Sequence, residues 1–346
     1  MTTITARQAF GAEFVGAEGF LNSPTYGLPP QFLFQALQDC MRSWQAGTMD
    51  AAAFDEPVAA GRAGFAALVG SPVDSVAMAG NVSAALGLVA AAIPDGSRVA
   101  TLSGEFTSTT FPFAAQEGRG VTVTELDSDE LVTTASDYDV VTASLVQSAN
   151  GAVLDVDALR QTVAGTDTIT VVDVTQAVGW KNIDLAWADV TVAAVYKWLL
   201  APRGIAWMAL SDRVADVMTP HAANWYAGQE PWQSIYGLPL RLAATARRFD
   251  ASPAWFSALG AGVTLPWLAS LDRDAVEAHS LGLARRLRSE LELPKEESAI
   301  VSIPTAAADR LRQAGIRASI RAGAVRVGFH LYNTEEDLDR LVDVLR

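Results

Sequence analysis

The sequence has little cysteine, little lysine and no long apolar run. Cys40 is the single cysteine among 346 residues, which excludes a disulfide framework and a cysteine-rich metal site. Lysine and arginine together number 25 against 39 acidic residues, so the net charge is −14. Because nucleic acids and anionic membranes select basic surfaces, this balance argues against both as main partners.

The apolar runs are too short for a membrane protein. The longest, around residues 86–93, is far shorter than the roughly 20 residues needed to cross a bilayer, and the first residues lack the pattern of a signal peptide. Hydrophobic residues nevertheless make up 50% of the chain, which is enough for a sizeable core and too many for a disordered protein. We therefore expect a soluble protein located in the cytoplasm.

Short apolar runs alternate with helical patterns through the middle of the chain. This alternation predicts βαβ units and an α/β fold with a mostly parallel, seven-stranded sheet. The runs are continuously apolar, as expected for strands that are covered on both faces. The predicted strands are 75–79, 98–102, 121–126, 140–143, 168–173, 190–195 and 205–210, and the helices between them are 83–92, 108–117, 155–163 and 175–179.

The pattern changes near residue 253. Before the sheet, residues 17–30 are loop-like, and 31–46 and 51–69 are predicted helices. Beyond 253 come two long predicted helices, 254–270 and 272–291, and then a mixed segment with strands at 298–303, 316–320 and 325–329 and helices at 305–314 and 334–345. We therefore predict a large domain over residues 31–252 and a smaller α+β domain over 253–346.

An acid and a lysine follow two neighbouring predicted strands. Asp173 ends one apolar strand, and Lys197 follows the next. Ligands bind at the carboxyl ends of parallel strands in open α/β sheets. A buried ion pair would explain both residues. An imine-forming lysine, with an acid that keeps a pyridine nitrogen protonated, would explain them as well.

Two motifs together favour the second explanation. They are Asp173-x-x-Gln176 and, 24 residues beyond the Asp, Lys197 followed by Trp-Leu-x-x-Pro-Arg-Gly. In both, and from residue 20 to residue 337, the chain resembles the class V aminotransferases, pyridoxal-phosphate enzymes of fold type I that include cysteine desulfurases, kynureninases and isopenicillin-N epimerase. The resemblance implies that residues 1–30 contribute to the small domain and the active site, and that a homodimer shares its active sites.

The resemblance also implies roles in holding pyridoxal phosphate. Lys197 would form the internal aldimine, Asp173 would hold the pyridine nitrogen, and Gln176 would lie near the phenolic oxygen. Val82 and Ser83 would open a helix beneath the phosphate, because free N–H groups at a helix N-terminus favour an anion. Ser83 is also explained as a plain helix N-cap.

Four further residues would line the cofactor. Tyr196 resembles a phosphate contact, and Ser252 a hydroxyl that reaches the phosphate of the partner subunit, although Ser252 also fits a turn. Phe106 falls where the family stacks a ring on the cofactor, with a core phenylalanine as the alternative. Ser148 falls where the family places a polar contact to the phenolic oxygen.

An arginine of the small domain would bind the substrate carboxylate, because its planar fork matches a carboxylate. Arg326 and Arg321 are the two candidates, and Arg326 matches the kynureninase pattern better. Asn22 is a second candidate contact, or else a turn residue.

The residues also limit the reaction. Cys40 is expected to be a small buried hydrophobic residue, which argues against persulfide chemistry, and the three histidines show no metal spacing. We expect an aminotransferase-type reaction on an amino acid or related amine, by way of the Lys197 aldimine and a Cα carbanion. A C–S lyase that works by β-elimination and an epimerase are the alternatives, and a non-catalytic, regulatory cofactor-binding protein is the alternative of another class.

The loop 224–232, rich in aromatic residues, fits a lid, a dimer contact or core packing.

Overall fold

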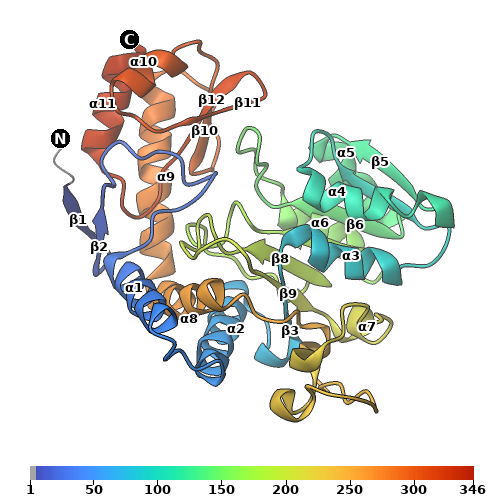
Figure 1. The fold of residues 1–346 in the computed structure, drawn as a ribbon. Helices are drawn as coiled ribbons and strands as arrows, with labels where there is room; N and C mark the ends of the chain where they lie inside the picture. The colour runs from blue at the N-terminus through green and yellow to red at the C-terminus, as the bar shows by residue number, and fades with distance from the viewer. Residues whose placement is uncertain (1–4) are drawn as a thin grey trace.

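The computed structural model describes residues 5–346 and contains a seven-stranded sheet (Figure 1). The strand order is β3-β9-β8-β7-β6-β4-β5, with β4 to β8 joined in parallel and β9 antiparallel to both of its neighbours. This confirms the predicted α/β fold. The strands are β3 (Val76–Ala79), β4 (Arg98–Leu102), β5 (Thr122–Leu126), β6 (Val140–Ser144), β7 (Ile169–Asp173), β8 (Val190–Ala194) and β9 (Ala206–Leu210).

Both faces of the sheet are covered, as its apolar strands predict. Successive side chains of a strand point to opposite faces. Val76 and Met78 of β3 therefore join one core with α2 (Asp55–Val69) and α8 (Trp255–Ser270). Ala77 and Ala79 join another with α3 (Val82–Ala92) and α4 (Thr107–Ala114). Two short helices, α5 (Ser128–Thr134) and α6 (Val156–Val163), complete the cover at the β4–β6 end.

Helix α8 packs along α2 at glycine contacts. A side chain at Gly64 of α2 would place its Cβ 2.7 Å from the backbone of Leu265, and one at Gly262 of α8 would come within 2.4 Å of Pro57. These glycines let the two helices approach closely, beside α1 (Gln31–Gln45). Although α8 follows residue 253, it therefore lies against the first helices of the chain. The domain boundary at 252–253 stays a prediction.

The last part of the chain forms a smaller α+β lobe. Its antiparallel sheet has the order β10-β12-β11 and packs with α9 and α11 around an apolar core. Its elements are α9 (Arg273–Glu290), β10 (Ile300–Ile303), α10 (Ala308–Gln313), β11 (Ser319–Arg321), β12 (Ala324–Gly328) and α11 (Glu335–Leu345). In Figure 1 the β1–β2 hairpin lies beside this lobe, below α11 in this view.

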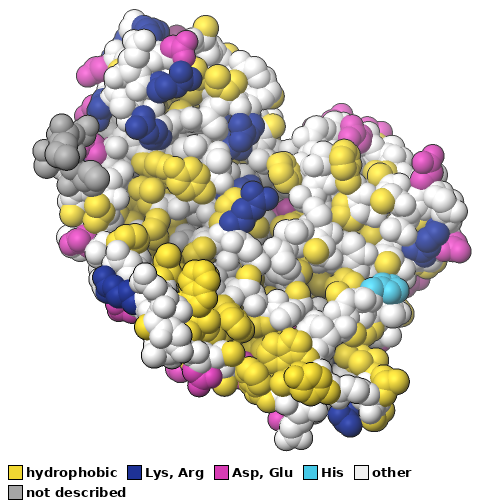
Figure 2. Space-filling model, in the orientation of Figure 1, with side chains coloured by type: hydrophobic (Ala, Val, Ile, Leu, Met, Phe, Trp, Pro, Cys, Tyr) yellow, Lys and Arg dark blue, Asp and Glu magenta, His cyan; other side chains and the backbone are white. Residues whose placement is uncertain are grey.

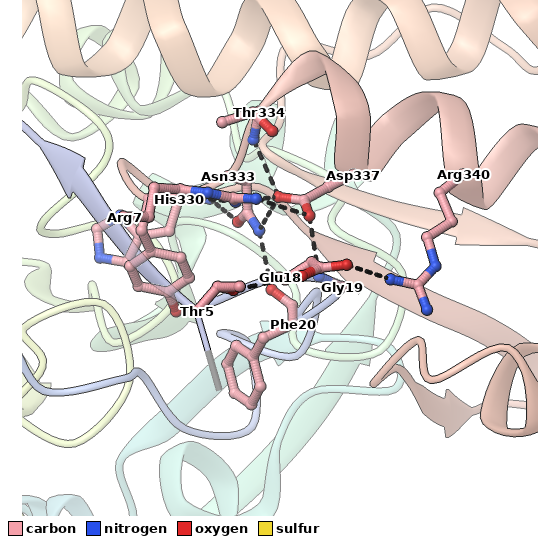
Figure 3. Close-up of polar contacts among 11 residues, drawn as sticks. Thr5, Arg7, Glu18, Gly19, Phe20, His330, Asn333, Thr334, Asp337 and Arg340 are labelled. Atoms are coloured by element: carbon pink, nitrogen blue, oxygen red, sulfur yellow. Dashed lines mark hydrogen bonds and ion pairs between the residues drawn. The ribbon is translucent and has the colours of Figure 1, made fainter. Parts of the chain in front are cut away.

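The N-terminal segment is tied to the small lobe by buried polar contacts (Figure 3). The Asp337 carboxylate at the start of α11 accepts hydrogen bonds from the Gly19 N–H at 2.9 Å and from Arg7 at 2.6 Å. Asn333 donates its amide to the Phe20 carbonyl at 2.9 Å. The segment then runs to the sheet, where the Gly27 N–H donates to the carbonyl of residue 196 at 2.9 Å. It therefore connects the small lobe to the segment that follows β8.

Three local features differ from the sequence predictions. Residues 175–179 form turns and no helix, because Gly179 has a φ of +109° and a Cβ there would lie 2.3 Å from the Trp198 carbonyl oxygen. The hairpin of β1 (Ala6–Ala9) and β2 (Ala12–Val15) was not predicted, nor was the short helix α7 (Asp212–Ala215). Within residues 5–346, no helix is long and apolar enough to cross a membrane.

Candidate active site

A cavity of about 340 Å³ opens at the carboxyl ends of β6, β7 and β8. The N-terminus of α3 and the residue before α4 form its other walls, so it lies where an open α/β sheet places a ligand. The structure brings most of the predicted residues together there. Those that line it are Val82, Ser83, Phe106, Ser148, Asp173, Gln176, Tyr196 and Lys197.

Lys197 is buried, with 6% of its surface exposed. Its Nζ lies 5.4 Å from the centre of the Phe106 ring and 5.8 Å from that of Tyr196. Burial lowers the pKa of Lys197 to about 8; the charge of Asp173 opposes this shift, and nearby arginines add to it. The amine is therefore partly neutral near physiological pH, as a nucleophile or base requires.

Asp173 is buried at the end of β7. Its carboxylate accepts hydrogen bonds from the Thr175 N–H at 2.7 Å and the Thr109 hydroxyl at 3.3 Å. Burial raises its pKa, while these hydrogen bonds and Lys197 oppose the shift. Among residues 5–346 the Lys197 ammonium makes no ion pair with a carboxylate, whereas Lys181 pairs with Glu277 at 3.0 Å. Lys197 and Asp173 therefore form no direct ion pair, although their charges influence each other.

The first turn of α3 faces the cavity. Asn81 is the N-cap, since its side chain accepts from the Ala84 N–H at 2.9 Å, which removes the N-cap explanation for Ser83. The Ser83 hydroxyl instead donates to Ser108 at 2.9 Å. The N–H groups of Val82 and Ser83 have no acceptor in the described part of the chain. This end of the helix is suited to an anion.

Gln176 and Ser148 belong to one chain of linked hydrogen bonds. The Gln176 amide donates to the Pro24 carbonyl at 2.9 Å and to the Ser148 hydroxyl oxygen at 3.1 Å, and its oxygen accepts from the Trp198 indole at 2.8 Å. The Ser148 oxygen also accepts from Arg326 at 3.2 Å. Because both lone pairs of this oxygen are then used, the Ser148 proton is free to be donated to another group.

Arg326, on β12, is 1% exposed and has no carboxylate partner within residues 5–346. Its guanidinium donates to the Ser148 carbonyl, to the Thr25 hydroxyl at 3.0 Å and to the Ser319 hydroxyl at 3.3 Å. Burial, together with the charge of Arg321, lowers its pKa to about 10. A buried cation bonded only to neutral groups is a ready site for an anion.

The cavity is lined by Phe106 but not by Asn22, Ser252 or Cys40. Asn22 does not line the cavity, and its side-chain oxygen is buried without a hydrogen-bond partner in the described chain. Ser252 is exposed and outside the cavity. Phe106 is 47% exposed, so it is not a core residue. Cys40 is half-buried on α1 rather than fully buried, and it lies outside the cavity as well.

Sequence reasoning missed Glu105 and Arg203. Glu105 is buried, and its carboxylate accepts from the Phe106 N–H, the Ser144 N–H and the Ser144 hydroxyl, each at 2.7 Å. Burial raises its pKa. Arg203 lines the cavity and lies over the Tyr196 ring, 5.3 Å from its centre. The one available signal was position, because Glu105 precedes Phe106 and Arg203 belongs to the Pro-Arg-Gly motif.

The fold and the cavity together define a protein of the type that the sequence resembles, and comparison with known proteins identifies the family. The family model described as aminotransferase class V matches residues 46–313. The chain therefore belongs to the class V aminotransferases, which confirms the resemblance and, at the level of the family, the dependence on pyridoxal phosphate.

Two curated relatives span most of the chain. An uncharacterized aminotransferase, YcbU of Bacillus subtilis, is 25% identical over 81% of this chain and 80% of its own length. Isopenicillin N epimerase of Streptomyces clavuligerus is 26% identical over 94% of this chain and 93% of its own length. The two relatives carry different activities in their names, so they leave the reaction of this chain open.

Solved structures agree on the fold. A cysteine desulfurase from Thermococcus onnurineus NA1 superposes with a TM-score of 0.80 at 19% identity, covering 94% of this chain and 93% of that one. A cystine C-S lyase in complex with cysteine persulfide has a TM-score of 0.81 at 15% identity, covering 95% and 97%. At these identities the likeness shows the fold alone, and it confirms the expected fold type.

Proposed function

We propose that this chain is a pyridoxal-phosphate enzyme that performs an aminotransferase-type reaction on an amino acid or a related amine. One observation carries the proposal. A buried lysine with a pKa of about 8 faces a cavity without an acid partner among residues 5–346, while a buried aspartate lies at the end of the adjacent strand. Burying a lysine without an acid partner costs folding free energy, and such perturbed groups are typical of active sites.

The donor groups in the cavity fit the cofactor. The first turn of α3 with Ser83 suits the phosphate, and the Phe106 ring suits one face of an aromatic ring. Asp173 would hold the pyridine nitrogen, and Lys197 would hold the aldehyde carbon. When bound, the cofactor supplies an electron sink for the electron pair left at a substrate Cα.

The chain's own residues would direct the proton and the substrate. Lys197, neutral in part near pH 8, would take the Cα proton and return it. Arg326 would bind the substrate carboxylate, since its hydrogen-bond partners within residues 5–346 are all neutral oxygens. Ser148 contacts Arg326 and Gln176, and it would donate its free proton to the phenolic oxygen.

β-Elimination and epimerisation use the same Cα proton transfer and remain the alternatives. Cys40 lies on α1 and does not line the cavity, so a C–S lyase of this architecture would eliminate directly rather than through a cysteine of the same chain. A non-catalytic, regulatory protein would need neither a neutral lysine nor an acid opposite the pyridine nitrogen.

We also propose a homodimer with shared active sites. Trp44 of α1 is 59% exposed, and the loop around residue 236 carries Tyr236 at 89% and Leu238 at 88% exposure. Figure 2 shows hydrophobic side chains gathered over the lower part of this face. Such a surface is typical of an interface, and the exposed Ser252 would be available to the partner's site. Light scattering on Tyr236→Ser with Leu238→Ser tests this, because a dimer through this face should dissociate.

Absorbance of the purified protein tests the cofactor and its attachment. Wild type should show a visible band that borohydride fixes covalently to Lys197, as peptide mass spectrometry would locate it, and Lys197→Ala should show no such adduct. Keto-acid formation, release of a β-substituent, and loss of Cα chirality then separate the three reactions. A wild type that stays colourless after incubation with pyridoxal phosphate would overturn the proposal.

A further inference from the structure

Two arginines share one face of the β11–β12 hairpin, where Arg326 pairs with Ser319 and Arg321 pairs with Ala324. Ser319 of β11 pairs directly with Arg326 of β12, and its hydroxyl accepts a hydrogen bond from that guanidinium at 3.3 Å. Arg321 lies two residues beyond Ser319 on the same strand, so its side chain leaves from the same face of the hairpin. This is the face that Arg326 turns toward Ser148 and the cavity.

Arg321 has no acid of its own within residues 5–346. Its guanidinium donates only to the carbonyl of the preceding residue, Ile320, at 2.7 Å. Its place on the same hairpin face as Arg326 brings its charge toward the cavity, and this charge lowers the pKa of both Lys197 and Arg326. Two like charges on one hairpin face repel each other, and an anion bound near them relieves part of that repulsion.

The lining of the cavity itself adds another positive charge. Arg203, from the large lobe, lines the cavity, and among residues 5–346 it forms no ion pair. The two acids nearby, Asp173 and Glu105, are buried and already bonded to neighbouring N–H and hydroxyl groups. The mouth of the cavity is therefore positive in a chain whose net charge is −14. In Figure 2, dark blue side chains lie where the small lobe meets the rest of the molecule.

We infer that Arg321 binds a second acidic group, carried on the substrate side chain, so that the site selects dicarboxylic amino acids. This inference rests on the proposed function, in which Arg326 binds the α-carboxylate. A substrate with one carboxylate would satisfy Arg326 and leave Arg321 uncompensated, whereas a substrate with two would satisfy both. The exposed position of Arg321 suits the end of a side chain rather than the reacting carbon.

Binding to the holoenzyme tests the inference. We would titrate pairs of α-methyl amino acids of equal length, one ending in a carboxylate and one in an amide, and follow the absorbance of the cofactor. These compounds have no Cα proton, so the change reports binding alone. Wild type should bind the acidic member about tenfold or more tightly, since a hydrogen bond between charged groups is one of the stronger kinds.

Variants then assign the preference to one residue. Arg321→Ala should reduce the acidic-to-amide ratio to about one, and Arg321→Lys should retain part of it. Arg312→Ala removes an exposed arginine of the same lobe, on α10, and should leave the ratio unchanged. Arg326→Ala should weaken both members of a pair together.

Three results would overturn the inference. Equal affinity of wild type for both members of every pair would exclude a second acidic group. An equal loss of affinity for both members in Arg321→Ala would make Arg321 the ligand of the α-carboxylate instead. Absence of the cofactor band would overturn the proposed function and the inference with it, whereas a normal band without acidic preference overturns the inference alone.

Discussion

The molecule has two groups of buried polar residues, one around Asp337 in the small lobe and one around Lys197 at the end of the large sheet. They differ in how completely their charged groups are paired. Around Asp337 every carboxylate oxygen has a donor, from Arg7, Gly19, Thr334 and Asn333 (Figure 3). Around Lys197 the pairing is incomplete. Within residues 5–346, Lys197 forms no ion pair with a carboxylate, and the hydrogen-bond partners of Arg326 are all neutral.

The difference separates a structural cluster from a site prepared for a ligand. A buried charge costs free energy unless it is paired and hydrogen-bonded. The Asp337 cluster meets that requirement from its own chain and fixes residues 7–20 against α11. The cavity meets it only partly, so a ligand with an acceptor for Arg326 and a reactive centre for Lys197 would complete it. Substitutions in the two clusters should therefore affect different measurements.

Lys197→Ala should have the largest effect, and it should be confined to chemistry. The rate of Cα proton exchange in an amino-acid substrate should fall by about 10²–10⁴-fold, the usual contribution of a positioned general base. The free energy of unfolding should not decrease, because the substitution removes a buried group that lacks an acid partner. Deuterium incorporation by NMR and urea unfolding measure the two quantities. A stability loss as large as that of Asp337→Ala would contradict the comparison.

Asp337→Ala should show the opposite pattern. Removing one partner of a buried charge pair costs about 3–5 kcal/mol, and here it also leaves the N–H of Gly19 and the guanidinium of Arg7 without their acceptor. The free energy of unfolding should fall by that amount. Asp343→Ala is the control, an exposed acid on the same helix, and should change stability by less than about 0.5 kcal/mol. Equal losses in the two variants would show that the cluster contributes little.

Much of the sheet and part of the site could be predicted from sequence. The central strands β7 and β8 are largely apolar runs with clear ends, so the places of Asp173 and Lys197 follow from the strand assignments and the parallel topology. Residues 175–179 show the limit. Their apolar spacing fits a helix, but the left-handed φ of Gly179 and its contact with Trp198 come from a segment about 20 residues further along the chain.

The remaining site residues depend on register and distant contacts. The sequence offers Arg321 and Arg326 as small-lobe arginines and favours Arg326 only by resemblance, whereas the pairing of Ser319 with Arg326 and the contact with Ser148 show that Arg326 is the buried one. Glu105 has no local signal besides its position before Phe106, because its partner Ser144 is 39 residues away. The contacts of Gln176 with Pro24 and Trp198 likewise join three separate segments. The functional roles of these residues stay predictions until variants are measured.

The pH dependence of Lys197 sharpens the comparison further. A protonated amine cannot attack an aldehyde, so covalent attachment of pyridoxal phosphate to protein freed of cofactor should accelerate as pH rises and level off above a midpoint near pH 8. Asp173 raises the pKa of Lys197 through its charge. Asp173→Asn should therefore move the midpoint to lower pH. Borohydride trapping at each pH gives the rate, and a midpoint near pH 10 in wild type would mean that Lys197 is not desolvated.

Glu18→Gln should have the smallest effect, at the edge of the paired cluster. Glu18 meets Arg340 at 3.0 Å, but the two side chains are 54% and 39% exposed. Water and salt screen such a pair, and exposed pairs contribute about 0–1 kcal/mol. The free energy of unfolding should therefore change by less than about 1 kcal/mol, and the change should disappear in high salt. Because Glu18 lies next to Gly19, whose N–H is bound by Asp337, a loss approaching that of Asp337→Ala would mean that the exposed pair holds the whole segment in place. A small, salt-sensitive loss would place the stability of this region in its buried centre.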